Sequence, residues 1–127
     1  MRFLIPLSSL LVAYTSAAPL DARQAKSVTL ALSNDQTGAY AGVQFAASGA
    51  DKSILTLFGT TSVGSNGHVK ATSVQLTAFP QTISCVLKNN GATVTTLTAQ
   101  HTYFDLDGNP GAAIPVDLTN AVVKCNA

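Results

Sequence analysis

The sequence predicts an all-β fold, a small single-domain β-sandwich or barrel of about seven or eight antiparallel strands with one disulfide. Three observations predict it. Short segments alternate apolar and polar residues with the period of two typical of half-buried strands, and Gly, Asn and Pro turns separate them. Thr and Val are abundant, whereas Glu is absent and Arg does not occur after position 23. No stretch combines a sustained helical period with caps at both ends.

The first half of the domain contains four candidate strands. The clearest covers 27–33, where Val and Leu alternate with small or polar residues, and a shorter one covers 43–45. The almost wholly apolar run 53–58 predicts a central strand that is covered on both faces. After a predicted turn at 64–67, the fourth candidate covers about 68–76, where the apolar face changes side, a change that a β-bulge can absorb.

The second half of the domain adds further alternating segments, which cover 82–88, 92–98, 100–106, 114–118 and 121–125. Between the first two, Asn89, Asn90 and Gly91 are typical of a tight hairpin turn. By the parity of their strands, Cys85 and Cys125 both lie on inward faces. We therefore expect a buried bridge between two strands.

Cys85 and Cys125 are the only cysteines of the chain. In an oxidising compartment, one intramolecular disulfide is the expected state of such a pair. The bond would restrict the unfolded chain by about 4 kcal/mol on the entropic model. The alternatives are a catalytic thiol, which needs a neighbouring base, and a metal site, which needs more ligands at short spacing. The sequence around the two cysteines supplies neither.

The start of the chain predicts secretion. Arg2 is followed by an uncharged apolar run and then by small residues, which is the order of a signal peptide. Cleavage after Ala17 is favoured over cleavage after Ala18, because Pro19 would follow the second cut directly. A membrane anchor is the alternative, but Pro6 interrupts the run, and a spanning helix needs about 20 apolar residues.

The predicted signal peptide, 1–17, is followed by a short pro-segment, 18–23, which reads APLDAR and ends at Arg23. A lone basic residue in such a stretch predicts a second, trypsin-like cut, so that the mature β-rich domain is 24–127 and begins at Gln24. This start of about 24 residues resembles the small secreted proteins of filamentous ascomycete fungi. The resemblance implies removal of the pro-segment and an extracellular, effector-like or elicitor-like factor.

The charges of the predicted mature domain balance, since residues 24–127 contain five lysines and five aspartates. Nucleic-acid binding and adsorption to an anionic membrane both need a basic face, so neither is predicted. We expect no cofactor, a monomer, and an extracellular protein or a glycan as the partner.

The segment DLDGN offers a candidate calcium site. Asp105, Asp107 and Asn109 place oxygen-bearing side chains at alternate positions, which resembles the opening of a calcium loop. The pattern then departs from that loop, because Pro110 replaces the turn glycine and Val116 replaces the bidentate glutamate. A tight turn between strands is the alternative, and it accounts for the same residues.

Candidate catalytic residues are few. His101, Tyr103 and Asp105 would project from one face of a strand as a contact patch, and a solvated face is the alternative. His68, the other histidine of the chain, also lies on a predicted solvent side. Ser62 does not have the Gly-x-Ser-x-Gly spacing of a nucleophile elbow, and no carboxylate pair is marked out for glycosidase chemistry. We therefore predict no catalytic residue.

Together with the secretory start and the missing catalytic constellation, the resemblance implies a secreted, non-enzymatic binding protein that acts at a host interface. The alternatives are a structural or adhesive component of the fungal cell wall and a small hydrolase whose residues converge only in space. Glycan binding often uses exposed aromatic rings, and the mature chain has no Trp and offers only Tyr40 and Tyr103 for it.

Overall fold

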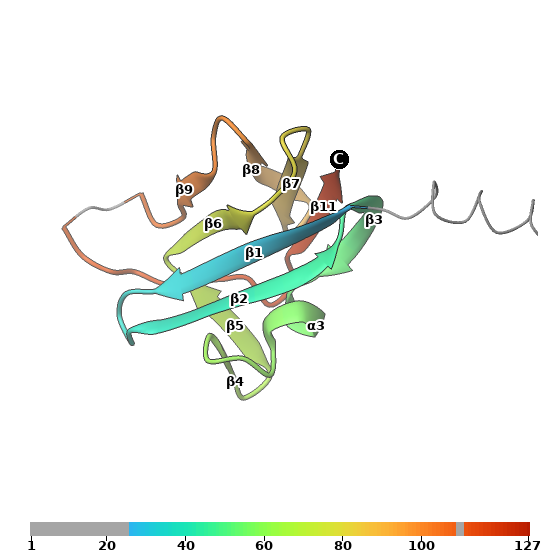
Figure 1. The fold of residues 1–127 in the computed structure, drawn as a ribbon. Helices are drawn as coiled ribbons and strands as arrows, with labels where there is room; N and C mark the ends of the chain where they lie inside the picture. Colours follow the sequence, from blue (N-terminus) through green and yellow to red (C-terminus); the bar gives the residue numbers. More distant parts are fainter. Residues whose placement is uncertain (1–25, 109–110) are drawn as a thin grey trace, which may run out of the picture.

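The computed structural model describes residues 26–108 and 111–127, which form an all-β domain with one short helix (Figure 1). In chain order the elements are β1 (Ser27–Asn34), β2 (Ala39–Ala46), β3 (Ser48–Ser53), α3 (Ile54–Phe58), β4 (Gly64–Ser65), β5 (His68–Ala71), β6 (Ser73–Ala78), β7 (Ser84–Asn89), β8 (Ala92–Thr98), β9 (Tyr103–Asp105), β10 (Val116–Asp117) and β11 (Val122–Asn126). Among the described residues, no helix is long and apolar enough to cross a membrane.

The strands form three antiparallel sheets. The first sheet has the order β2-β1-β6-β9, the second has the order β3-β11-β7-β8, and the third and smallest has the order β10-β5-β4. In Figure 1, β4, β5 and α3 lie below the long strands β1 and β2. Leu30 of β1, Val69 of β5 and Leu87 of β7 belong to one buried cluster, so the three sheets enclose a single hydrophobic core. The predicted small all-β domain is confirmed.

β1 is the central strand of the first sheet, because it pairs with β2 on one side and with β6 on the other. Val28, Leu30 and Leu32 alternate along it and are at most 1% exposed. The predicted strand at 27–33 is therefore confirmed, and its apolar face lies in the core.

The prediction of a strand at 53–58 is wrong, because these residues form α3 and its cap. The side-chain oxygen of Ser53 accepts a hydrogen bond from the backbone N of Thr56, at 3.2 Å, and so caps the first turn. Ile54 and Phe58 are four residues apart and fully buried, whereas Thr56 between them is exposed. The sequence pattern does not reveal the i, i+4 spacing of Ile54 and Phe58, because Leu55 and Leu57 between them are also apolar.

The change of apolar face within 68–76 is a change of sheet and not a bulge. β5 belongs to the third sheet and β6 to the first, and only Thr72 separates them. The backbone N of Thr72 donates to the Ser33 carbonyl at 2.7 Å, and its hydroxyl accepts from the Asp35 backbone N at 3.1 Å. These bonds hold the crossing point against the end of β1.

Two predicted turns are tight hairpins. Asn90 and Gly91, with φ of 54° and 83°, join β7 to β8. Asn66 and Gly67, with φ of 51° and 78°, join β4 to β5 in the same way. Positive φ at both central positions is the geometry of the type I′ turn, which Asn and Gly tolerate best.

Two predicted strands are shorter than expected. β9 begins only after a turn in which Thr98 and His101 exchange backbone hydrogen bonds of 2.9 and 3.1 Å. The segment 114–118 contributes only β10 to a sheet, and Ile114 is 55% exposed whereas Leu118 is fully buried. The described part of the chain has eleven strands, more than predicted, and several of them have only two or three residues.

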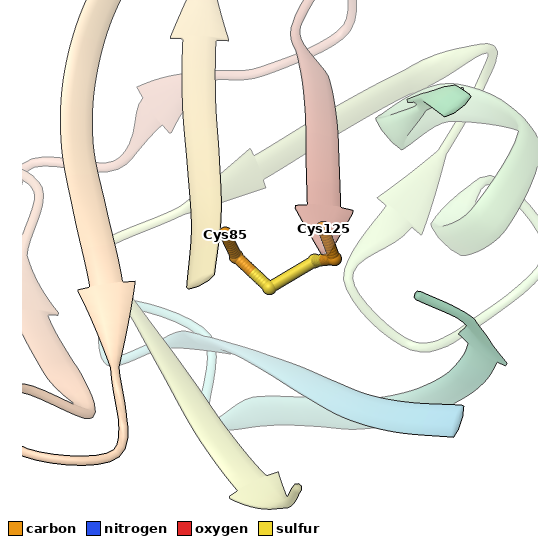
Figure 2. The surroundings of a disulfide bond; sticks show 2 residues. All are labelled: Cys85 and Cys125. Carbon is orange, nitrogen blue, oxygen red and sulfur yellow. A yellow bond between two sulfur atoms is a disulfide. The ribbon is translucent and has the colours of Figure 1, made fainter. Parts of the chain in front are cut away.

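The predicted disulfide is present. Cys85 of β7 and Cys125 of β11 lie directly opposite each other in the strand pairing and are joined by a bond between their sulfur atoms (Figure 2). Both residues are 1% exposed and belong to the core cluster. The bridge between two strands, expected from parity, is confirmed.

Candidate functional site

A polar cavity of about 580 Å³ lies where the β1–β2 turn meets the β4–β5 hairpin. Its volume is within the range of pockets that bind small molecules. We name it the turn pocket. Its lining residues are Asn34, Gln36, Thr37, Ala39, Ser62, Val63, Ser65, Asn66, His68 and Lys70.

Asn34 holds the two sides of the turn pocket together. Its side-chain Nδ2 donates to the Lys70 carbonyl at 3.3 Å, which ties the end of β1 to β5. Its Oδ1 accepts from the backbone N of Gln36 at 3.0 Å and of Thr37 at 3.4 Å, which closes the turn. Because Asn34 is buried and its amide is used in this way, we assign it a structural role in shaping the pocket.

Three other lining side chains are available to a ligand. Within the described part of the chain, the side chains of Gln36, Ser65 and Asn66 make no hydrogen bond. The side-chain amides of Gln36 and Asn66 each have an NH₂ group that donates and an oxygen that accepts, and the Ser65 hydroxyl can both donate and accept. Since these groups are held on two tight turns and no carboxylate of the described residues lines the pocket, the lining matches a ligand that is rich in hydroxyl groups.

Ser62 and His68 line the same pocket, although the sequence predicted no link between them. The Ser62 hydroxyl donates to the Tyr40 carbonyl at 2.8 Å. A serine nucleophile instead gives its proton to a neighbouring base. The arrangement therefore fits a hydrogen-bonding wall better than a hydrolytic pair. Tyr40 is 56% exposed and follows a lining residue, so it offers an aromatic side chain beside the pocket.

His68 belongs to a network with Thr119 and Asp117. Its Nδ1 lies 3.4 Å from the Thr119 hydroxyl, which donates to Asp117 Oδ1 at 2.5 Å. Because the hydroxyl proton is given to Asp117, the hydrogen of the first contact belongs to His68 Nδ1. The Thr119 hydroxyl, followed by its backbone N–H, lowers the pKa of Asp117, and the charges of His68 and Lys70 add to the effect.

A smaller cavity, of about 320 Å³, is acidic. Asp35, Tyr103, Asp105, Asp107 and residues 111–113 line it. A hydrogen bond with the Asp107 side chain is the main reason why the pKa of Asp105 is raised, and desolvation and the Asp107 charge act in the same direction. A hydrogen bond between two carboxyl groups requires that one of them carries a proton.

The predicted contact patch is only partly assembled. Tyr103, which is 50% exposed, and Asp105 project from β9 and line the acidic pocket. His101 is exposed but lies before β9, in the turn that follows β8, and it does not line that pocket. The structure therefore brings together two of the three predicted residues.

Three other predicted positions lie outside the described residues: Asn109 of the candidate calcium site and the processing residues Ala17 and Arg23. Among the described residues, no group of three His, Cys, Asp or Glu is arranged to hold a metal ion. With its third oxygen donor outside the described ranges, the calcium site stays a prediction, as does the processing of the N-terminal segment.

Sequence reasoning did not find the turn pocket. The polar turn at 34–38 and the hairpin at 64–67 were separate signals, and no residue type marked them as partners. They meet because the chain passes from β5 into β6 at Thr72 and because Asn34 bonds to Lys70. In a comparison with known proteins, no family model, no curated protein and no solved structure matched the chain.

Proposed function

We propose that this protein is a secreted, non-enzymatic binding protein that holds a glycan in the turn pocket. The observation that carries the proposal is the lining of that pocket. Gln36, Ser65 and Asn66 present hydrogen-bonding groups that the described chain does not use, and no carboxylate among the described lining residues competes with them. Sugar hydroxyl groups both donate and accept hydrogen bonds, so this lining complements them.

Secretion is supported by two features. The first is the basic, apolar and small-residue order at the start of the chain. The second is the buried disulfide between Cys85 and Cys125, since such bonds form and persist in oxidising compartments. Together with the resemblance of the first 24 residues to fungal secreted proteins, these features favour an effector-like or elicitor-like factor that meets its ligand at a host surface.

The binding test is a glycan array followed by calorimetry with the glycan that binds most strongly. Gln36→Ala removes one amide from the pocket. Asn66→Gly removes another and keeps the turn, because glycine adopts the positive φ of Asn66 without strain. Each change should weaken binding by about 2- to 10-fold, the effect of one lost hydrogen bond. Asn90→Gly makes the same change in the other type I′ turn and should leave the affinity unchanged.

Two results would overturn the proposal. One is that no glycan binds the wild-type protein. The other is that Gln36→Ala and Asn66→Gly bind as tightly as Asn90→Gly, in which case the binding site lies elsewhere on the domain.

The same experiments separate the alternatives. A protein that binds host glycans and is recovered free in culture fluid acts as a secreted factor, whereas one that binds glycans of the producing wall and stays with washed hyphae is a wall component. A hydrolase would convert the bound glycan. Joint replacement of His68 and His101 by Ala should then abolish turnover, and we expect no turnover to be present.

A further inference from the structure

The outer edge of β2 presents backbone groups that pair with no other strand of the described chain. Just beyond the end of β2, the backbone N of Ala47 donates to the Lys26 carbonyl at 2.7 Å. Lys26 and Ala47 are therefore a hydrogen-bonded pair of the ladder between β1 and β2. In an antiparallel ladder, hydrogen-bonded and non-hydrogen-bonded pairs alternate. Following the register back along β2, the backbone groups of Gly42, Gln44 and Ala46 point away from β1. All three residues are exposed.

An independent contact agrees with this assignment. Tyr40 has the same parity as Gly42, and its carbonyl accepts from the Ser62 hydroxyl, a group that lies outside the β1–β2 ladder. This bond also ends the open stretch, because Ser62 covers the edge at Tyr40. The free edge therefore runs from Gly42 to Ala46, and no described residue bonds to its outward backbone groups.

Edge strands of natural proteins are normally protected by charges, prolines, bulges or short length. β2 has none of these protections, because it is eight residues long, pairs with β1 in an unbroken register and lies in a stretch without charge or proline between Asp35 and Asp51. The other edges in the described chain are protected. β3 carries Asp51 and Lys52, β8 has an irregular register, and β4, β9 and β10 have two or three residues each.

We propose that β2 pairs in antiparallel fashion with β2 of a second copy of this chain, around a two-fold axis at Gln44. Gly42 then lies opposite Ala46 of the partner subunit, and the two Gln44 residues lie opposite each other. In this register the free backbone N–H and C=O groups of one copy face those of the other copy. The pairing does not include Tyr40, whose carbonyl already accepts from the Ser62 hydroxyl. The first sheet of each copy continues into that of the other.

The chemistry of the edge favours a second copy over a foreign strand. Strand addition to a sheet edge gains its selectivity from pockets for alternate side chains. The residues of β2 whose backbone groups point away from β1 are Gly42, Gln44 and Ala46. Their side chains are neutral and form no such pocket in the described structure. Self-pairing places no like charges opposite each other, and paired glutamine amides can donate to and accept from one another. Gln44 uses one amide hydrogen for the Ser27 hydroxyl, at 3.0 Å, and retains the other.

The size of the contact sets its strength. A stable interface contributes roughly 20–30 residues from each side. The open edge from Gly42 to Ala46 is far smaller, so the dimer is weak and forms only as the concentration rises. At low concentration the chain is then the monomer that the sequence predicts.

Sedimentation velocity on the purified, oxidised full chain, from micromolar to millimolar concentration, tests the proposal. The wild-type protein should shift from monomer to dimer. Gln44→Lys places two positive charges at the axis and should remain monomeric throughout. Gln75→Lys makes the same change at an exposed position of the same sheet, on β6, which is paired on both sides, and should dimerise like the wild type.

Hydrogen exchange locates the contact. The backbone amides of Gly42, Gln44 and Ala46 should exchange more slowly as the dimer forms, whereas the Val43 amide, which faces β1, should not change. The proposal is overturned by a wild-type protein that stays monomeric at all concentrations, by a dimer that persists in Gln44→Lys, or by equal loss of the dimer in Gln75→Lys.

Discussion

Cys85 and Cys125 lie opposite each other in the pairing of β7 with β11 and are also joined by a disulfide, with a Cα–Cα distance of 4.0 Å. The strand pairing alone already places the two residues side by side in the folded state. The bond therefore acts mainly on the unfolded chain, where it holds together positions that are 40 residues apart in sequence.

Replacing both cysteines by alanine should lower the free energy of unfolding by about 4 kcal/mol, the entropic cost of opening a loop of this length. Urea unfolding followed by circular dichroism measures the loss. Wild-type protein with its disulfide reduced is the matched comparison and should lose a similar amount. An unchanged unfolding midpoint in both samples would show that the disulfide does not stabilise this fold.

The sequence predicted the parts of the fold that depend on local alternation. Val28, Leu30 and Leu32 marked an inward face, and the same parity rule placed both cysteines in the core. The type I′ turns were predictable because Asn-Gly pairs tolerate positive φ. In each case the signal lies within a few residues of the structure that it predicts.

What escaped prediction depends on tertiary contacts. Thr72 divides one apparent strand between two sheets through bonds to Ser33 and Asp35, which are far from it in sequence. The turn pocket needs the bond from Asn34 to Lys70 for the same reason. Parity also placed His101 beside Tyr103 and Asp105, but His101 closes the turn after β8 and does not line the acidic pocket. Sequence patterns do not carry such long-range pairings.

The Asp105–Asp107 contact predicts a stability that decreases from acid to neutral pH. The hydrogen bond with Asp107 raises the pKa of Asp105 above its ordinary value of 3.8. A carboxyl group with a raised folded-state pKa contributes stability below the unfolded pKa and loses it as the pH rises through the folded pKa. Asp105→Asn keeps a hydrogen-bond donor next to Asp107 at every pH. This variant should therefore lack that loss, as measured by urea unfolding across the acid range.

Asp51→Asn is the control for this experiment, because it removes a carboxylate from β3, away from the acidic pocket. It should follow the pH dependence of the wild type. If Asp105→Asn and the wild type show the same pH dependence, the two carboxyl groups do not share a proton in solution.

Asp117 predicts a pH dependence of stability opposite to that of Asp105. The Thr119 hydroxyl and backbone N–H lower the pKa of Asp117 below 3.8, so its contribution to stability is present above that value and is lost as the pH falls through the folded pKa. Thr119→Val removes the hydroxyl and should move the pKa of Asp117 upward, as followed by NMR of its carboxyl carbon. Thr119→Ser restores the hydroxyl and should restore the low pKa. A titration of Asp117 that is the same in all three proteins would contradict the network.

Thr56 distinguishes the observed helix from the strand that the sequence predicted. In a strand, Ile54, Thr56 and Phe58 would share one face, because alternate residues point the same way. In α3, Ile54 and Phe58 are fully buried while Thr56 is exposed. Thr56→Lys should therefore change the free energy of unfolding by no more than about 0.5 kcal/mol, as is usual at exposed sites. Ile54→Lys would bury a charge without a partner, so it should cost several-fold more. Equal losses in urea unfolding would mean that both side chains face the core, as the strand requires, and α3 would then be the wrong assignment for this segment.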